Sequence, residues 1–203
     1  WKPGGLRQAK PQSGDLDRGN GGMIWTCQTK STPSYTQIHR GTICKKERLV
    51  KKQGYAAQHY KTMTTDDICA LPVQQLAGGG CLLFMWATFP TLPDALRVMD
   101  AWGFTYKTAA FVWVKKYKCG KNFVGMGAYT RANAEICLLG VKPGFKAAAQ
   151  IKSHSVHQVI ESPIQEHSAN PDETRHRIVE LLGDVPRIEL FARQRVPGWD
   201  AWG

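Results

Sequence analysis

Cys81-Leu82-Leu83-Phe84-Met85-Trp86-Ala87 is a continuous apolar run of strand length that follows the three glycines 78–80. A run that is apolar at every position is typical of a strand covered on both faces of a sheet. Residues 93–102 then show apolar side chains at helical spacing, and this segment ends at Gly103. A buried strand followed by an amphipathic helix predicts an α/β fold.

The same alternation continues along the chain. Further helices are predicted at residues 64–76 and 171–182, and further strands at 111–114, 136–141 and 187–191. Strands that alternate with helices indicate a mostly parallel sheet with helices on both faces. With 203 residues, the chain has room for one domain of this kind.

The composition favours a polyanionic partner. The chain carries 27 Lys and Arg against 16 Asp and Glu, a formal net charge of +11. Residues 1–44 contribute six basic and two acidic side chains, so most of the positive charge lies outside this segment. Because a basic surface attracts phosphates without specifying a sequence, nucleic acid is the expected partner.

Cysteine and hydropathy patterns exclude other classes of protein. The six cysteines form no Cys-x-x-Cys pair and no zinc-like cluster with histidine, so no metal site is predicted. No apolar stretch of about 18 residues occurs, so no membrane segment is predicted. We expect a soluble cytoplasmic protein.

Several blocks in fixed order carry a family resemblance. They are His59-Tyr60-Lys61-Thr62-Met63 and the segments 68–72, 83–86, 101–115, 131–139, 171–173 and 187–203, the last reading RIELFARQRVPGWDAWG. From Gly54 onward the sequence resembles the adenine-amine methyltransferases, the family of the mRNA-adenosine methyltransferases and their phage and bacterial DNA-modifying relatives. The resemblance implies a Rossmann-like α/β fold and S-adenosylmethionine as cofactor. It also implies methylation of the exocyclic amine of adenine in DNA, with RNA as an alternative substrate.

One family feature is missing from the chain. The family carries Asp-Pro-Pro-Trp at a strand end upstream of the His59 block, where this chain has Gln37, Ile38, His39 and Arg40. Residues 37–41 can be encoded by CAG ATC CAC CGT GG, with GG from the Gly41 codon, and a shifted reading of these bases, GAT CCA CCG TGG, spells Asp-Pro-Pro-Trp. We therefore interpret residues 1–44 as an irregular, non-native segment read in a shifted frame, and residues 45–203 as the methyltransferase-like domain. A natural divergent N-terminus is the alternative, and the nucleotide sequence of codons 30–55 decides between them.

The frame-shift hypothesis has two consequences. First, residues 1–44 should be irregular and leave a gap in the sheet beside residues 81–87. Second, the chain should be catalytically impaired, because the resemblance implies that the missing Asp and a Pro carbonyl accept hydrogen bonds from the adenine amine. If the N-terminus is genuine, a non-catalytic methyltransferase-like subunit that binds nucleic acid is the alternative function.

Two groups of residues are candidates for substrate binding. The resemblance places Tyr60, Asn133 and Glu135 on the substrate side, with a structural aromatic and an ordinary loop as the alternative interpretations. Lys115, Lys116 and Tyr117 belong to a stretch that interleaves basic and aromatic side chains. Such a stretch can neutralise phosphates and stack on bases, although a solvated charged face has the same composition.

The cofactor side is assigned from the C-terminal blocks. The resemblance places Glu189, Phe191, Arg193 and Arg195 around S-adenosylmethionine, with His167 in a neighbouring loop. A carboxylate at a strand end can accept hydrogen bonds from a ribose hydroxyl or an ammonium group, and an Arg can hold a carboxylate with two bonds. Asn170 stands where family members often have Lys, which weakens one expected cofactor contact. DNA is the preferred nucleic-acid partner; target sequence, strand preference and oligomeric state are not assigned.

Overall fold

The fold is a seven-stranded sheet with the strand order β5-β3-β4-β2-β1-β6-β7. A computed structural model describes residues 23–28, 63–77, 80–125, 127, 129–165, 169–192 and 194–202. The strands are β1 (Met23–Gln28), β2 (Cys81–Ala87), β3 (Thr105–Lys116), β4 (Ala134–Val141), β5 (Val159–Pro163), β6 (Arg187–Leu190) and β7 (Asp200–Trp202).

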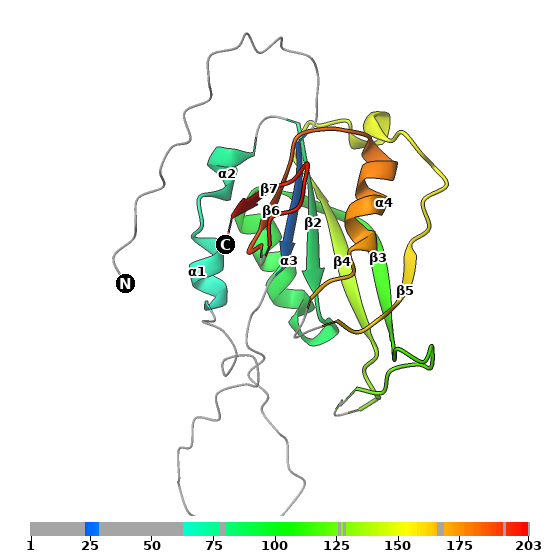
Figure 1. Ribbon diagram of the computed structural model, residues 1–203. Helices are drawn as coiled ribbons and strands as arrows, with labels where there is room; N and C mark the ends of the chain where they lie inside the picture. The colour runs from blue at the N-terminus through cyan, green and yellow to red at the C-terminus, as the bar shows by residue number, and fades with distance from the viewer. Residues whose placement is uncertain are drawn as a thin grey trace, which may run out of the picture.

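The sheet is mostly parallel, as the sequence predicts. The pairs β1–β2, β1–β6, β6–β7 and β3–β5 are parallel, whereas β4 runs antiparallel to both β2 and β3. The carboxyl ends of the parallel strands and the beginning of β4 therefore lie at one edge, the lower edge in Figure 1. We call it the carboxyl edge. The chain leaves β1 towards β2 and returns on the other side of β1 as β6, so the strand order switches direction at β1.

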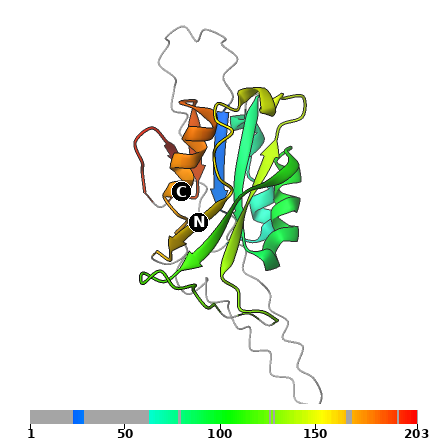
Figure 2. The ribbon, with the colours of Figure 1, turned by 90° about the vertical axis from the view of Figure 1, so that its right-hand side faces the viewer.

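Helices cover both faces of the sheet. They are α1 (Thr65–Cys69), α2 (Val73–Leu76), α3 (Leu92–Ala101) and α4 (Glu173–Leu182), with short 3₁₀ turns η2 (Phe89–Thr91) and η3 (Ala147–Gln150). Figure 2 shows α3 and α4 on opposite sides of the strands. Along β2, Leu83 and Met85 enter the core beneath α1 and α3, while Phe84 and Trp86 enter the core beneath α4. This two-sided burial explains why β2 is apolar throughout.

Local sequence signals set the helix ends. The Thr64 side chain accepts a hydrogen bond from the Asp67 N–H, and Asp67 accepts one in return, which caps the start of α1. The expected single helix over 64–76 is wrong, because Pro72 lacks an N–H and disfavours helical geometry in the residue before it. Helix α4 ends at Gly183, which has φ 78°, a conformation that glycine adopts without strain. None of the described helices is long and apolar enough to span a membrane.

Strand β1 corrects the expectation for the N-terminal segment. Residues 23–28 form a strand between β2 and β6, with Trp25 in register with Leu83 and with Ile188. The irregular structure predicted for 1–44 is wrong at these six residues, and the predicted gap beside β2 is filled. Met-Ile-Trp-Thr-Cys is rich in residues that favour strands, and a slot between two strands satisfies backbone groups on both sides. Residues 1–22 and 29–44 lie outside the described part of the chain.

Candidate functional site

The carboxyl edge brings together the described candidate residues from both halves of the sheet. Lys115 is the penultimate residue of β3 and Glu135 is the second residue of β4, on one side of β1. Glu189 and Phe191 stand at the end of β6, on the other side of β1. Open α/β sheets bind ligands outside the carboxyl ends of their strands, at the point where the strand order switches.

A cavity of about 770 Å³ opens at this edge, and we call it the β2–β4 cavity. Its lining includes residues 88–90 after β2, Lys115, Phe123, Asn133 and Glu135. The Asn133 carbonyl accepts the backbone N–H of Lys115 at 2.8 Å, which joins the ends of β3 and β4. The cavity thus combines aromatic and apolar surface with a carboxylate and an amide, a composition typical of small-ligand sites.

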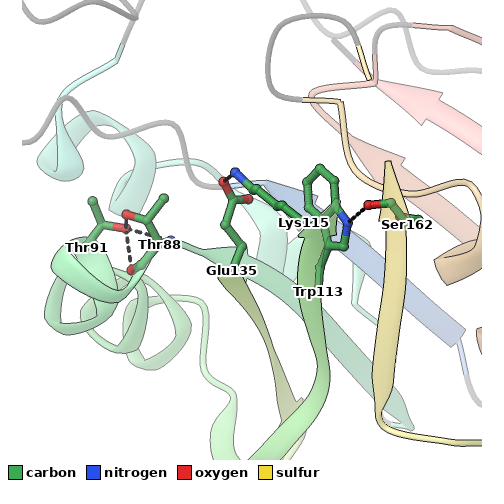
Figure 3. A network of polar contacts seen from close by, with 6 residues as sticks. All are labelled: Thr88, Thr91, Trp113, Lys115, Glu135 and Ser162. Atoms are coloured by element: carbon green, nitrogen blue, oxygen red, sulfur yellow. Dashed lines mark hydrogen bonds and ion pairs between the residues drawn. The ribbon is translucent and has the colours of Figure 1, made fainter. Parts of the chain in front are cut away.

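An ion pair stands at the wall of the β2–β4 cavity. Lys115 Nζ lies 2.5 Å from Glu135 Oε1, and the two side chains are only 20% and 15% exposed. Figure 3 shows the two side chains pointing toward one another beside Trp113. The Trp113 ring centroid is 4.9 Å from the Lys115 ammonium, and its Nε1 donates to the Ser162 carbonyl of β5 at 3.1 Å. The Lys115 ammonium therefore balances the charge of the Glu135 carboxylate.

Lys116 and Tyr117 also have partners within the fold. Lys116 Nζ lies 3.2 Å from Glu161 Oε1 and donates to Asn122 Oδ1 at 2.8 Å. The Tyr117 ring packs edge-to-face on Phe123, with centroids 5.2 Å apart. The charges of Lys115 and Lys116 are thus compensated. In the described part of this loop, the exposed cations without an ion pair are Lys118, Lys121 and Arg131.

The turn after β2 presents an aromatic side chain that the sequence analysis missed. Thr91 Oγ1 accepts the Thr88 N–H at 3.2 Å, so the two threonines close the turn (Figure 3). Phe89, held in this turn, is 51% exposed at the cavity lining. Its signal in the sequence is its position, the first aromatic residue after a buried strand.

A second charged group lies beyond β1, and we call Asp172, Arg175 and Glu189 the β6–α4 cluster. Arg175 Nε donates to Glu189 Oε2 at 2.9 Å, and Nη2 donates to Glu189 Oε1 at 3.1 Å. Arg175 Nη1 also donates to Asp172 Oδ1 at 2.5 Å. Arg175 was absent from the sequence prediction. In the sequence, the only indication of this contact is that Arg175 lies about one helical turn after Asp172.

The residue after β6 has an unusual backbone conformation. Phe191 has φ 58°, in the left-handed region that side chains other than glycine rarely adopt. Its ring packs edge-to-face on Trp202 of β7, with centroids 5.3 Å apart, and the Ala192 N–H donates to the Trp202 carbonyl at 3.0 Å. Such strained positions cluster at binding and catalytic sites, because surrounding contacts must maintain them.

Comparison with known proteins identifies the domain. The MT-A70 family profile matches residues 44–203. The chain belongs to the MT-A70 family. It is 32% identical over 148 residues to "Type II methyltransferase M.MunI" of Mycoplasma sp, covering 73% of this chain and 60% of the relative. It is 26% identical over 148 residues to "N(6)-adenosine-methyltransferase MT-A70-like" of Arabidopsis thaliana, covering 71% of this chain and 21% of the relative.

MT-A70 membership confirms the recognised family and the Rossmann-like methyltransferase fold. The chain spans well under two thirds of the Arabidopsis relative and 60% of the Mycoplasma relative. Of the candidate residues, Lys115, Lys116, Tyr117, Asn133, Glu135, Asn170, Glu189, Phe191 and Arg195 are described. The candidates Gln37, Ile38, His39, Arg40, Tyr60, His167 and Arg193 lie outside the described residues. Within the described ranges, no group of His, Cys, Asp and Glu could hold a metal ion.

Proposed function

We propose that this MT-A70 domain is of the kind that methylates the exocyclic amine of adenine in DNA with S-adenosylmethionine as methyl donor, and that this activity is impaired in a chain that lacks Asp-Pro-Pro-Trp. The observation that carries the proposal is the pairing of two acidic sites along one sheet edge. Glu135 lines a cavity on one side of β1, and Glu189 is the penultimate residue of β6 on the other side. A methyl transfer needs two ligands held beside one another, and the switch point at β1 offers adjoining places for them.

The residues at the end of β6 fit the cofactor. S-adenosylmethionine supplies an electrophilic methyl group on a sulfonium when it is bound. Its ribose hydroxyls and ammonium are hydrogen-bond donors, and Glu189 offers a half-buried carboxylate to accept them. Asn170 offers a further acceptor, since its Oδ1 is buried and has no hydrogen-bond partner among the described residues. The half-buried Phe191 ring supplies apolar surface, and Arg195 lies exposed beyond it.

The β2–β4 cavity fits a purine base. Its volume of about 770 Å³ lies in the range of small-ligand pockets, and enzymes that modify a base take it out of the stack into such a pocket. Phe89 and Phe123 offer rings on which a base can stack. Glu135 and Asn133 can accept N–H groups of the amine or the ring edge. Acceptors for the amine hydrogens would favour a pyramidal nitrogen whose lone pair could attack the methyl group. The N–CH₃ bond would form as the S–CH₃ bond breaks, S-adenosylhomocysteine would leave, and the methylated amine would release one proton to solvent.

Two comparisons bear on the choice of DNA over RNA. Identity is higher to the Mycoplasma type II methyltransferase, at 32%, than to the Arabidopsis adenosine methyltransferase, at 26%. The chain also covers 60% of the former and 21% of the latter. The bacterial protein is therefore the better guide to the substrate.

Restoring the missing motif tests the proposal. The chain has Gln37-Ile38-His39-Arg40 in place of Asp-Pro-Pro-Trp, so we expect no methyl transfer from it. Replacing residues 31–41 with the shifted-frame translation should restore transfer, because the carboxylate that accepts the amine hydrogen bond returns. Incorporation of tritiated methyl groups into adenine-rich DNA measures both proteins. Robust activity of the unmodified chain would show that another residue replaces the Asp and would end the frame-shift hypothesis.

A non-catalytic subunit that binds nucleic acid is the second candidate function. The substitution of Gln37 for the expected Asp favours it if the gene sequence shows that residues 29–44 are genuine. This function predicts DNA binding without methyl transfer, even after the motif is restored. Filter binding with the restored chain, run beside the transfer assay, separates the two functions.

A further inference from the structure

The β6–α4 cluster holds the one cofactor-side carboxylate that the structure describes at the end of β6. We propose that Arg175 is a positioning residue for the cofactor, acting through Glu189. Arg175 fixes the orientation of the Glu189 carboxylate, so that the remaining lone pairs of Glu189 meet hydrogen-bond donors of S-adenosylmethionine. This inference rests on the cofactor use proposed above.

The alternation of β6 directs Glu189 towards α4. Ile188 and Leu190 belong to the core beneath α1 and α3, so Glu189 between them lies on the opposite face of the strand. Arg175, in the first turns of α4, meets it there: Nε lies 2.9 Å from Oε2, and Nη2 lies 3.1 Å from Oε1 and 2.8 Å from Oε2. A two-bond contact from a planar guanidinium fixes both distance and orientation, which a single ammonium contact does not.

The contact of Arg175 Nε and Nη2 with Glu189, which we call the fork, leaves part of the Glu189 carboxylate available to a ligand. A carboxylate has about four lone-pair directions, and Arg175 Nε and Nη2 engage one on each oxygen. The Glu189 side chain is 21% exposed, so the remaining directions are accessible to a ligand. The third contact, from Nη1 to Asp172, holds the guanidinium from the side away from Glu189. Arg175 therefore orients Glu189 without saturating it.

A second arginine on α4 provides a control that distinguishes the positioning of Glu189 from the simple attachment of the helix to the sheet. Arg177 is also 17% exposed and pairs with Glu173 Oε1 at 2.5 Å. Its Nη1 donates to the Val159 carbonyl at 2.8 Å and to that of His157, so it ties α4 to β5. Arg177 matches Arg175 in residue type, helix and exposure but contacts no carboxylate at the end of β6. It is the natural control for the loss of an ion-paired arginine.

Binding of S-adenosylhomocysteine to the full chain, measured by calorimetry, tests the proposal. Two analogues are measured alongside it, one lacking a ribose hydroxyl and one lacking the amino group. The unmodified chain should prefer S-adenosylhomocysteine to at least one analogue by about tenfold, the value of one charge-assisted hydrogen bond. In Arg175→Gln, the dissociation constant for S-adenosylhomocysteine should rise about tenfold and that preference should fall towards one. Arg177→Gln should leave both quantities within about twofold.

Further variants keep the proposal testable if Arg175→Gln folds poorly. Arg175→Lys keeps the positive charge but loses the two-bond contact. Compared with Arg175→Gln, it should restore only part of the preference for S-adenosylhomocysteine over its analogue. Asp172→Asn leaves the fork intact and should change binding less than threefold. If both Arg175 variants keep the full preference for S-adenosylhomocysteine over its analogue, Arg175 only attaches α4 to β6, and the inference is overturned. Equal losses of affinity and of preference in Arg175→Gln and Arg177→Gln would also overturn the inference. If the unmodified chain binds no S-adenosylhomocysteine, the proposed cofactor use fails and the inference falls with it, a result distinct from the others.

Discussion

The two sides of β1 each present a glutamate beside a basic residue, but the basic residues differ. At the β2–β4 cavity, Glu135 takes a single hydrogen bond from the ammonium of Lys115. In the β6–α4 cluster, Glu189 takes two from the guanidinium of Arg175. Exposure is similar, at 20% and 15% for the first pair and 17% and 21% for the second. The difference therefore lies in geometry and not in burial.

This difference matches the different demands of the two proposed ligands. A lysine ammonium is a point charge on a flexible stem, so Glu135 can rotate towards an incoming base and return. An arginine fork resists such rotation, so Glu189 keeps one orientation for a cofactor that binds in every cycle. We infer an adaptable carboxylate on the base side and a fixed one on the cofactor side.

Removing each glutamate should have the largest effect. Glu135→Leu leaves the half-buried Lys115 without its ion pair, and Glu189→Leu leaves the half-buried Arg175 with Asp172 alone. Each change should lower the free energy of unfolding by about 1–3 kcal/mol. The loss should be greater for Glu189→Leu, because Glu189 accepts two hydrogen bonds from its partner and Glu135 accepts one. Urea denaturation gives both values.

Glu161→Leu is the matched control for these two variants. Glu161 pairs with Lys116 at 3.2 Å, but its side chain is 58% exposed, so its removal should cost less than about 1 kcal/mol. Equal losses in the free energy of unfolding in all three variants would show that burial does not strengthen these ion pairs.

Exchanging the cations should have an intermediate effect. Arg175→Lys replaces a fork with a point charge and should lower the free energy of unfolding by about 1 kcal/mol, the value of one hydrogen bond. Lys115→Arg keeps a donor beside Glu135, so its loss should be smaller. Double-mutant cycles with Glu189→Gln and Glu135→Gln measure the two coupling energies. A larger coupling for Lys115 than for Arg175 would reverse the distinction between adaptable and fixed carboxylates.

Loop cations should have a smaller effect that depends on salt. Lys118→Gln and Arg131→Gln should each reduce the slope of log affinity for DNA against log salt by about 1, because each cation is free to neutralise a phosphate. Lys115→Met should leave that slope unchanged, because its charge is already compensated by Glu135. Fluorescence anisotropy across a salt series provides the slopes. A reduced slope in Lys115→Met would restore Lys115 as a phosphate ligand.

The smallest effect concerns Cys137, two residues beyond Glu135 on β4. Complete burial raises the pKa of the Cys137 thiol, so it stays neutral and unreactive at pH 7–8, whereas Cys119 is exposed. The raised pKa supports stability below the unfolded-state value of about 8.5, and this contribution is lost as the pH rises above it. Maleimide labelling at pH 7 should modify Cys119 and spare Cys137, even in Glu135→Leu. Labelling of Cys137 in Glu135→Leu would show that β4 opens in this variant. The measured loss in the free energy of unfolding would then include more than the lost ion pair.

The sequence predicted those elements whose signals are local. Strand β2, helix α3 and helix α4 follow from an apolar run, an amphipathic spacing and a stop at Gly183. Strand β1 was missed, because its slot is defined by pairing with β2 and β6, which are distant in sequence. The family resemblance supplied Glu135 and Glu189, but not their basic partners. Those partners come from another strand and from a helix, so only the folded arrangement brings them within reach.

The position of β1 has a consequence for the order of folding. Its two neighbours are made at different times during synthesis, β2 in the first half of the chain and β6 near its end. Until β6 leaves the ribosome, one side of β1 has unpaired backbone groups, and the sheet cannot close around the switch point. Contacts between such distant segments slow folding, so a growing chain should depend on chaperones that shield strands. The β6–α4 cluster therefore takes shape only after β6 is made, whereas β3 and β4, which hold Lys115 and Glu135, are made earlier and pair directly.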